Sequence, residues 1–356
     1  AYTSVRLYAF RNLRDGVISI PSSQVFLIGE NGQGKSNFIE AVYLLSYGAR
    51  FRTRRDRELI RIGENEMSCF GTYDSQGAGH NVSVRLQDGA KRIEIDERTV
   101  QDRRDMISQM PSVVFQHSDM GYINGPPEMQ RYFLDQTLSL DAPSYIDDLR
   151  RYRKILKTRN TVLKEHSPDL LPVLNYQLAE TGLVLKRRRT EALETFNRVF
   201  AELFQSVGAL EHALTIEYRP SWTGIDSVQD VVKHVEGKRE QELSLGTTLS
   251  GPHRDRVLYR FGTMDFTQVA STGQTRLAAL ILRLAQARFF RERTGRRPIL
   301  LLDDVLLELD AGRRERFVAA LPESEQRIFT FLPGEPWKSY QNDDTLVLQV
   351  SNGSIQ

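Results

Sequence analysis

Few folds accommodate the loop Gly29-Glu30-Asn31-Gly32-Gln33-Gly34-Lys35-Ser36, because its pattern needs a strand before it and a helix after it. The apolar run 24–28 predicts the strand, and helical spacing of apolar residues predicts a helix over 35–48. Glycines let backbone N–H groups converge on phosphate oxygens, and the helix dipole favours the anion. A glycine-rich turn that merely links strand and helix is the alternative. The complete pattern in this context favours a nucleotide phosphate site.

Each position of this loop has an expected role. We expect the Lys35 ammonium to reach the β- and γ-phosphates of ATP, and the Ser36 hydroxyl to bind Mg²⁺. The backbone supplies further phosphate contacts, at Gly29, Asn31, Gly32 and Gly34.

A second apolar run, 299–302, ends in the carboxylates Asp303 and Asp304. A buried parallel strand would deliver both to the edge of the sheet where nucleotide phosphates lie. We expect Asp303 to hold Mg²⁺ and Asp304 to polarise the attacking water. Acidic residues that only cap the next helix are the alternative. Lys35, Asp303 and Asp304 are therefore candidate catalytic residues.

Lys35 and Asp303 are 268 residues apart, so a large segment is inserted between the two halves of the site. Long helical patterns run from about 143 to 165 and from about 170 to 207, and their short connection favours an antiparallel hairpin. Residues 66–115 are β-rich. The prediction is an α/β ATPase domain over 1–126 and 243–356, interrupted by an inserted α-helical domain over 127–242.

The segment Ser271-Thr272-Gly273-Gln274 opens a helix predicted over 275–293. A turn of this composition is a second anion-binding helix terminus, which a single ATP would not need from the same copy of the chain. A plain N-cap is the alternative, because Ser and Thr suit that position.

This segment resembles the signature of ABC ATPases, Leu-Ser-Gly-Gly-Gln, although Thr272 replaces a glycine and the leading leucine is absent. In that family the signature of one subunit binds the γ-phosphate held by the other. The resemblance therefore implies an ATP-dependent head-to-tail homodimer in which Ser271, Gly273 and Gln274 contact ATP, with Ser271 also catalytic. The run 308–310, Glu-Leu-Asp, resembles the D-loop of the same family.

Five further runs resemble the RecF family of ABC-type ATPases, over nearly the whole chain: 7–13, 46–53, 131–135, 251–255 and 352–353. The resemblance implies an ABC-ATPase head of mixed β-sheet, similar to Rad50 and SMC heads without a long coiled coil. It also implies slow, DNA-stimulated hydrolysis of ATP with Mg²⁺. The implied partners are double-stranded DNA and single-strand/double-strand junctions at gaps, RecR, RecO and indirectly RecA, in DNA repair, replication, recombination and the SOS response.

The sequence departs from this family at two places. It reads Gln116-His117-Ser118-Asp119 where the family has Pro-Glu-Asp, which leaves Gln116 as the candidate Q-loop ligand of Mg²⁺. The strand 327–331 lacks the histidine with which transporters sense the γ-phosphate, and Thr330 is the candidate replacement.

The net charge is only +2, so any DNA affinity must come from charges gathered on one face. The candidate DNA-contacting residues follow the first helix and are Arg50, Arg52, Arg54, Arg55 and Arg57. Basic clusters at 150–159 and 186–189 are further candidates. For each cluster, a solvated helix face with ion pairs is the alternative.

Other classes of protein fit the sequence less well. A small-molecule kinase has no use for a signature segment, and a transporter subunit should carry the full signature and a sensor histidine. A chromosome-organising ATPase needs arms far longer than this insertion. The single cysteine, Cys69, excludes an internal disulfide, and we expect a cytoplasmic protein without a membrane span.

Overall fold

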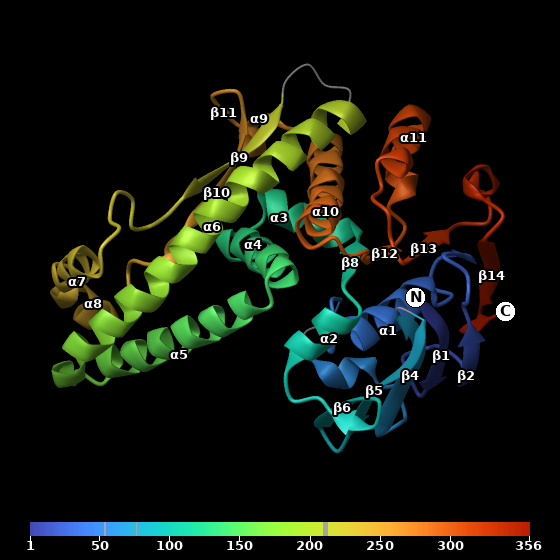
Figure 1. Cartoon of the computed structure of the whole chain (residues 1–356), viewed down its shortest axis with the longest axis horizontal. Coiled ribbons are helices and arrows are strands. Elements are labelled where there is room, and N and C mark those ends of the chain that lie inside the picture. Colours follow the sequence, from blue (N-terminus) through green and yellow to red (C-terminus); the bar gives the residue numbers. More distant parts are fainter. Residues whose placement is uncertain (53–54, 76, 209–212) are drawn as a thin grey trace. The chain divides into compact units, whose positions relative to one another are not determined.

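A computed structural model describes residues 1–52, 55–75, 77–208 and 213–356, with the side chains of Arg103, Pro168 and Glu308 left out. The chain divides into two compact units (Figure 1). The first combines residues 1–119 with 286–356, and the second is 120–285. The predicted insertion, 127–242, lies inside the second unit, which continues beyond it to Ala285.

The first unit contains a six-stranded sheet in the order β15-β14-β3-β13-β12-β8, whose strands are parallel except for β15. Its members are β3 (Gln24–Ile28), β8 (Ser112–Phe115), β12 (Ile299–Leu302), β13 (Gln326–Phe331), β14 (Thr345–Ser351) and β15 (Ser354–Ile355). Every residue of β3, β8 and β12 is buried, as continuous apolar runs in a parallel sheet require.

A second, antiparallel sheet of the first unit has the order β2-β1-β4-β5-β6-β7. Its strands are β1 (Tyr2–Tyr8), β2 (Gly16–Ser19), β4 (Glu66–Ser75), β5 (Ala78–Gln87), β6 (Ala90–Ile95) and β7 (Arg98–Thr99). The helix α1 (Lys35–Tyr47) packs against strands of both sheets, so nearly all of its residues are buried. Because α1 is packed between the two sheets, the position of its first residues, and so of the phosphate loop that leads into it, is fixed.

The first unit is completed by α2 (Arg103–Gln109), α11 (Ala311–Ala319) and the end of α10 (Thr272–Thr294). Its short 3₁₀ turns are η1 (Asp56–Leu59), η2 (His117–Met120), η5 (Leu306–Glu308) and η6 (Trp337–Tyr340). The predicted β-rich stretch 66–115 is interrupted by α2, whose start is fixed by the Asp102 side chain accepting from the Arg104 N–H. Local periodicity does not reveal this helix, because it spans only two turns.

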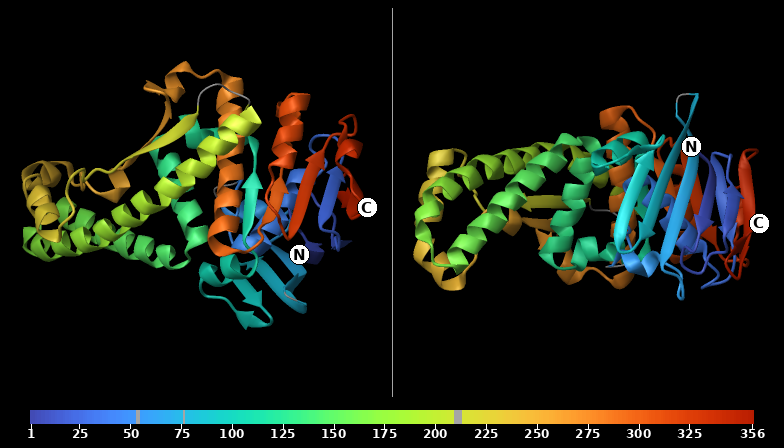
Figure 2. Two further views of the ribbon diagram at one scale, coloured as in Figure 1. Left: turned by 45° about the horizontal axis from the view of Figure 1, so that its top comes forward. Right: turned by 90° about the horizontal axis from the view of Figure 1, so that it is seen from below.

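The second unit is dominated by the hairpin of α5 (Ser144–Lys164) and α6 (Leu171–Gly208), which lie side by side (Figure 2). Its other helices are α3 (Gly121–Asn124), α4 (Pro127–Asp141), α7 (Val228–Glu236), α8 (Arg239–Leu245), α9 (Phe266–Val269) and the start of α10. The 3₁₀ turns η3 (Pro168–Leu170) and η4 (Pro252–Arg254) also belong to it. Val162, Leu163, Leu171 and Leu174 form an apolar cluster at the closed end of the hairpin.

The second unit also contains a sheet, and one of its strands lies within 127–242, where a helical domain is predicted. A three-stranded antiparallel sheet in the order β11-β10-β9 packs on α6. Its strands are β9 (Leu214–Arg219), β10 (Arg256–Phe261) and β11 (Met264–Asp265). Leu214, Ile216, Val257 and Tyr259 are buried. Since β9 and β10 are about 40 residues apart in the chain, local periodicity could not reveal their pairing. Within the described part of the chain, no helix is both long and apolar enough to cross a membrane.

Candidate functional site

The predicted phosphate loop lies between the end of β3 and the start of α1. A Cβ atom on Gly29 would lie 2.3 Å from the carbonyl oxygen of Val350, and Gly34 has a φ of 122°. Both positions therefore exclude other residues. Gly34 provides no side-chain cap for α1, so the first N–H groups of that helix remain available to an anion.

Two distant segments hold the loop in place. Asn12 Nδ2 donates to the Gly32 carbonyl (3.1 Å), and Asn37 Nδ2 donates to Asn12 Oδ1 (2.6 Å). The N–H of Asn352 donates to Gln33 Oε1 (2.6 Å), and the N–H of Gly353 donates to the Gln33 carbonyl (3.0 Å). The loop is thus pre-organised by residues that the sequence analysis noted only for a family resemblance.

The two polar side chains of the motif are fixed at the start of α1. Lys35 is 4% exposed, and its Nζ donates to the carbonyls of Gly29 (2.7 Å) and Glu30 (3.2 Å). Ser36 Oγ donates to Asp303 Oδ1 at 2.7 Å. The fold therefore brings Ser36 and Asp303 together, although they are 267 residues apart in the chain.

The parallel sheet explains this meeting, because the predicted residues follow neighbouring strands at one edge. Thr330 belongs to β13, which lies between β3 and β12. Its hydroxyl lies 3.4 Å from Asp303 Oδ1, donates to Asp304 Oδ1 (2.8 Å) and accepts from the Asp304 N–H (2.7 Å). Gln116 follows β8 on the far side of β12, where the Asp303 N–H donates to the Phe115 carbonyl (3.0 Å).

Burial raises the pKa of Asp303 to about 6, against the opposing effect of the Ser36 hydroxyl, while the charge of Asp304 raises it further. Such a carboxylate is poorly solvated and is stabilised by a cation. Asp304 beside it has a left-handed backbone, with a φ of 53°, which directs it from the end of β12 toward Thr330.

The donor set at this edge fits Mg²⁺ held together with nucleotide phosphates. Mg²⁺ keeps several waters and takes one or two protein oxygens besides those of the phosphates, which Ser36 and Asp303 can supply. Among the residues that the structure describes, no three His, Cys, Asp or Glu side chains gather as a metal cluster. A phosphate-dependent magnesium site needs no such cluster.

The signature segment lies in the second unit, whereas the phosphate loop lies in the first. Ser271 Oγ accepts from the Gln274 N–H (3.2 Å), and Gln274 Oε1 accepts from the Ser271 N–H (2.8 Å). This reciprocal pair is a capping box at the start of α10. Ser271 and Gly273 are nevertheless exposed, so the cap leaves the helix terminus accessible.

The run resembling a D-loop begins within η5. Asp310 caps α11 by accepting from the Arg313 N–H (2.8 Å). The side chain of Glu308 lies outside the described residues.

The arginines predicted to contact DNA differ in their surroundings. Arg50 pairs with Asp56, and Arg52 Nη1 donates to Asn37 Oδ1 (3.1 Å). Arg54 lies outside the described residues. Arg55 and Arg57 are exposed and have no ion-pair partner among the residues that the structure describes. These two are therefore the better candidates for contact with a polyanion.

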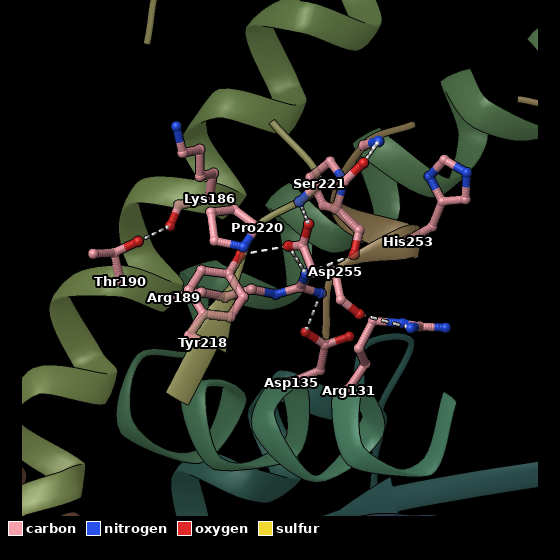
Figure 3. A network of polar contacts seen from close by, with 12 residues as sticks. Arg131, Asp135, Lys186, Arg189, Thr190, Tyr218, Pro220, Ser221, His253 and Asp255 are labelled. Carbon is pink, nitrogen blue, oxygen red and sulfur yellow. Dashed lines mark hydrogen bonds and ion pairs between the residues drawn. The ribbon is translucent and has the colours of Figure 1, made fainter. Parts of the chain in front are cut away.

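In the run 251–255, Asp255 lies in a buried polar network of the second unit (Figure 3). Arg189 donates to Asp255 Oδ2 (2.9 Å), to the Pro252 carbonyl (2.8 Å) and to Asp135 Oδ1 (2.8 Å). Asp255 Oδ1 also accepts from the Ser221 N–H (2.8 Å). Arg189 belongs to the predicted basic cluster 186–189, but it is buried and joins α6 to α4 and to η4 with the residue after it, rather than facing solvent.

His253 is fixed next to this network, between the Tyr152 hydroxyl (2.7 Å from Nδ1) and the Thr248 carbonyl (3.1 Å from Nε2). Burial lowers the pKa of His253 to about 4, so the ring is neutral near pH 7. These contacts indicate a structural role for this part of the run.

Comparisons with known proteins agree with this geometry. The family described as the RecF/RecN/SMC N-terminal domain matches residues 2–339. A DNA replication and repair protein RecF of Treponema pallidum (strain Nichols) is 40% identical over 347 residues, which cover 97% of this chain and 98% of that protein. A RecF of Synechococcus sp. (strain JA-3-3Ab) is 32% identical, over 99% of this chain and 96% of that protein.

Solved structures are similar over the whole chain. The recombination mediator protein RecF with ATP, in the RecFOR pathway, has a TM-score of 0.89 at 26% identity and covers 100% of this chain and 96% of that one. An SMC head bound to the C-terminal winged-helix domain of ScpA has a TM-score of 0.59 at 15% identity, with 100% and 96% covered. The second similarity concerns the fold alone.

Proposed function

The chain belongs to the RecF/RecN/SMC N-terminal domain family, on its RecF branch, and we propose that it is an ATP-dependent DNA-binding protein of recombinational repair. Its fold is that of the RecF and SMC heads, as the resemblance predicted. The observation that carries the proposal is the phosphate loop, pre-organised by Asn12 and Gly353, with Ser36 held 2.7 Å from Asp303.

We propose that ATP binds at this loop. The amides at the start of α1 and the Lys35 ammonium would hold its phosphates, and Ser36 with Asp303 would hold Mg²⁺, with Gln116 as a further ligand. The bound nucleotide and metal supply a polarised terminal phosphoryl group. Asp304 would orient and polarise the attacking water, and Thr330 fixes the position of that carboxylate. Hydrolysis is slow and resets DNA binding.

ATP would also join two copies of the chain. The terminus of α10, with Ser271, Gly273 and Gln274, would bind the γ-phosphate held by the partner copy. The exposure of Ser271 and Gly273 supports this assignment. The resulting homodimer would bind double-stranded DNA or single-strand/double-strand junctions at gaps, and would act with RecR and RecO to promote RecA loading in the cytoplasm.

The DNA-binding part of the proposal is tested with Arg55→Glu/Arg57→Glu. Both side chains are exposed, so reversal should leave ATP binding intact while replacing attraction for DNA phosphates by repulsion. We expect gapped-duplex binding to require ATP in the unmodified chain. In the variant, the plot of log affinity against log salt should become less steep, with a slope smaller in magnitude by about 1.8.

The control for this experiment is Lys35→Met, which should lose both ATP binding and ATP-dependent DNA binding. Nucleotide-independent affinity in the unmodified chain would contradict ATP gating. An unchanged slope in the arginine variant would remove residues 55–57 from the DNA contact.

A further inference from the structure

One face of α5 carries only basic and uncharged side chains from Leu149 to Lys164. Its cations are all exposed: Arg150, Arg151, Arg153, Lys154, Lys157 and Lys164. We call these six residues the α5 cationic face. The spacing of three and four residues gathers them on one side of the helix. The opposite side is buried through Tyr152, Arg159 and Leu163.

Four of these six cations have no ion-pair partner among the residues that the structure describes. Arg150 is 3.8 Å from Asp147 and Arg153 is 3.4 Å from Asp135, yet these arginine side chains remain 50% and 64% exposed. In the part of the chain that the structure describes, Arg151, Lys154, Lys157 and Lys164 form no ion pair and no side-chain hydrogen bond.

The neighbouring basic cluster at 186–189 behaves differently. Lys186 pairs with Asp226 (2.8 Å), Arg188 with Asp148 (2.8 Å), and Arg189 lies in the buried network. Its cations, apart from the exposed Arg187, hold the second unit together. The fold therefore makes use of one cluster and leaves the other facing solvent.

Unpaired like charges at this spacing destabilise a helix. Arg151 lies three residues from Lys154, and Lys154 three residues from Lys157, without a carboxylate between them. The chain as a whole is nearly neutral, with 48 basic and 46 acidic residues, so the concentration of charge on α5 is local. Among the described residues, only Arg150 and Arg153 of this face pair with carboxylates of the second unit, whereas a polyanion would neutralise the whole face.

The geometry of the α5 cationic face suits a nucleic-acid backbone. It extends about 21 Å at 1.5 Å per residue, a length over which duplex DNA carries about twelve phosphate charges. The aromatic residues of α5 are Tyr145 and Tyr152, and both are buried. Stacking on bases, the usual means of holding single strands, is therefore absent from this helix.

A groove of about 620 Å³ between α5 and α6 adjoins this face and shares Arg151 and Lys154 with it. Asp148 and Glu180 also line the groove, so the groove itself is mixed in charge. Only the exposed side of α5 between Leu149 and Lys164 is free of acidic side chains.

We propose that the α5 cationic face binds the phosphate backbone of double-stranded DNA, as a contact additional to Arg55 and Arg57 of the first unit. This inference rests on the proposed function. It assigns to the second unit a sequence-independent electrostatic contact that strengthens binding without reading bases.

The test compares two triple variants of equal charge change in the full chain. The first, Arg151→Gln/Lys154→Gln/Lys157→Gln, removes half of the α5 cationic face. The control, Arg198→Gln/Lys233→Gln/Arg239→Gln, removes exposed cations of α6, α7 and α8 in the same unit, all outside the candidate DNA-contacting clusters. Binding of a mixed-sequence duplex is measured with ATP over a series of salt concentrations. A third variant, Arg151→Lys/Lys154→Arg/Lys157→Arg, keeps the charge.

We expect the first variant to bind duplex about tenfold more weakly or worse, with a salt slope lower by up to about 2.7, while ATP binding is unchanged. The control and the charge-conserving variant should bind as the unmodified chain does. Equal duplex binding by the first variant and the control would overturn this inference but leave the proposed function standing. The inference would also be overturned if the first variant bound duplex DNA normally but no longer bound an acidic protein partner. Absence of duplex binding by the unmodified chain would contradict the proposed function as well.

Discussion

Asp303 is a carboxylate whose burial disfavours its negative charge. Its carboxylate lies at the end of a buried strand, and burial raises its pKa to about 6. A negative charge there is favourable only when a cation or hydrogen-bond donors compensate it. Ser36 supplies one donor, and Mg²⁺ would supply the positive charge.

The substitution Asp303→Asn should therefore leave the stability of the fold nearly unchanged while abolishing most of the activity. The amide keeps the shape of the side chain and removes the poorly solvated charge, so the free energy of unfolding should not fall by more than about 1 kcal/mol. Hydrolysis should fall about a hundredfold or more, because the proposed Mg²⁺ site would lose its carboxylate ligand. Nucleotide binding measured with and without Mg²⁺ checks the cause. A variant whose ATP affinity still increases with Mg²⁺ as in the unmodified chain would contradict this role.

Arg189 presents the same conflict in the second unit. Its side chain is 3% exposed and neutralises both Asp135 and Asp255. Arg189→Met should cost about 3–5 kcal/mol, since it leaves the buried Asp255 without its cation and Asp135 with only the largely exposed Arg153. Urea unfolding measures the loss. The matched control is Lys186→Met on the same helix, whose partner Asp226 is 84% exposed, and it should cost about 1 kcal/mol or less. Equal losses in the two variants would refute the structural role of the network.

At the scale of elements, the start of α10 has one observed role, as a helix cap, and one proposed role, as an anion-binding terminus. Ser271 begins the helix as an N-cap, and its side chain and backbone exchange hydrogen bonds with Gln274. The same terminus is exposed and can receive an anion. The two alternatives of the sequence analysis are therefore compatible with each other.

Ser271→Asp distinguishes these roles. Aspartate caps helices as well as serine does, so the stability should change by no more than about 0.5 kcal/mol. A carboxylate at this position would repel the γ-phosphate of a partner-bound ATP. We expect unchanged ATP binding by each copy, but loss of ATP-dependent dimerisation and hydrolysis, measured by mass in solution and by phosphate release. If the variant dimerises like the unmodified chain, Ser271 does not contact the partner's nucleotide.

Local sequence patterns predicted the elements whose apolar residues form a long helical repeat or an uninterrupted buried run. The helices α5 and α6 were expected within one or two residues of their ends, and the buried strands β3 and β12 within one. The helix α2 and the strand β9 were missed, because one is short and the other is defined by pairing with a strand far along the chain. Element length and non-local pairing set this limit.

At the scale of the whole molecule, the candidate site is assembled from both ends of the chain. The motif residues Lys35, Ser36 and Asp303 could be named from sequence, because their chemistry imposes a recognisable pattern. The support that Gly353 gives could not, since it is a backbone contact to Gln33, far along the chain, and the support by Asn12 depends on a side-chain hydrogen bond that no local pattern indicates. The sorting of the basic clusters into buried and exposed cations likewise required the structure.

The central claim is that each ATP is bound by Lys35 of one copy and Ser271 of another. It is tested by mixing Lys35→Met with Ser271→Asp, each of which should be inactive alone. In a mixed dimer, one site combines the intact Lys35 with the intact Ser271, so ATP hydrolysis should reappear at up to half of the unmodified rate per mixed dimer. A mixture that stays as inactive as either variant alone would contradict the account.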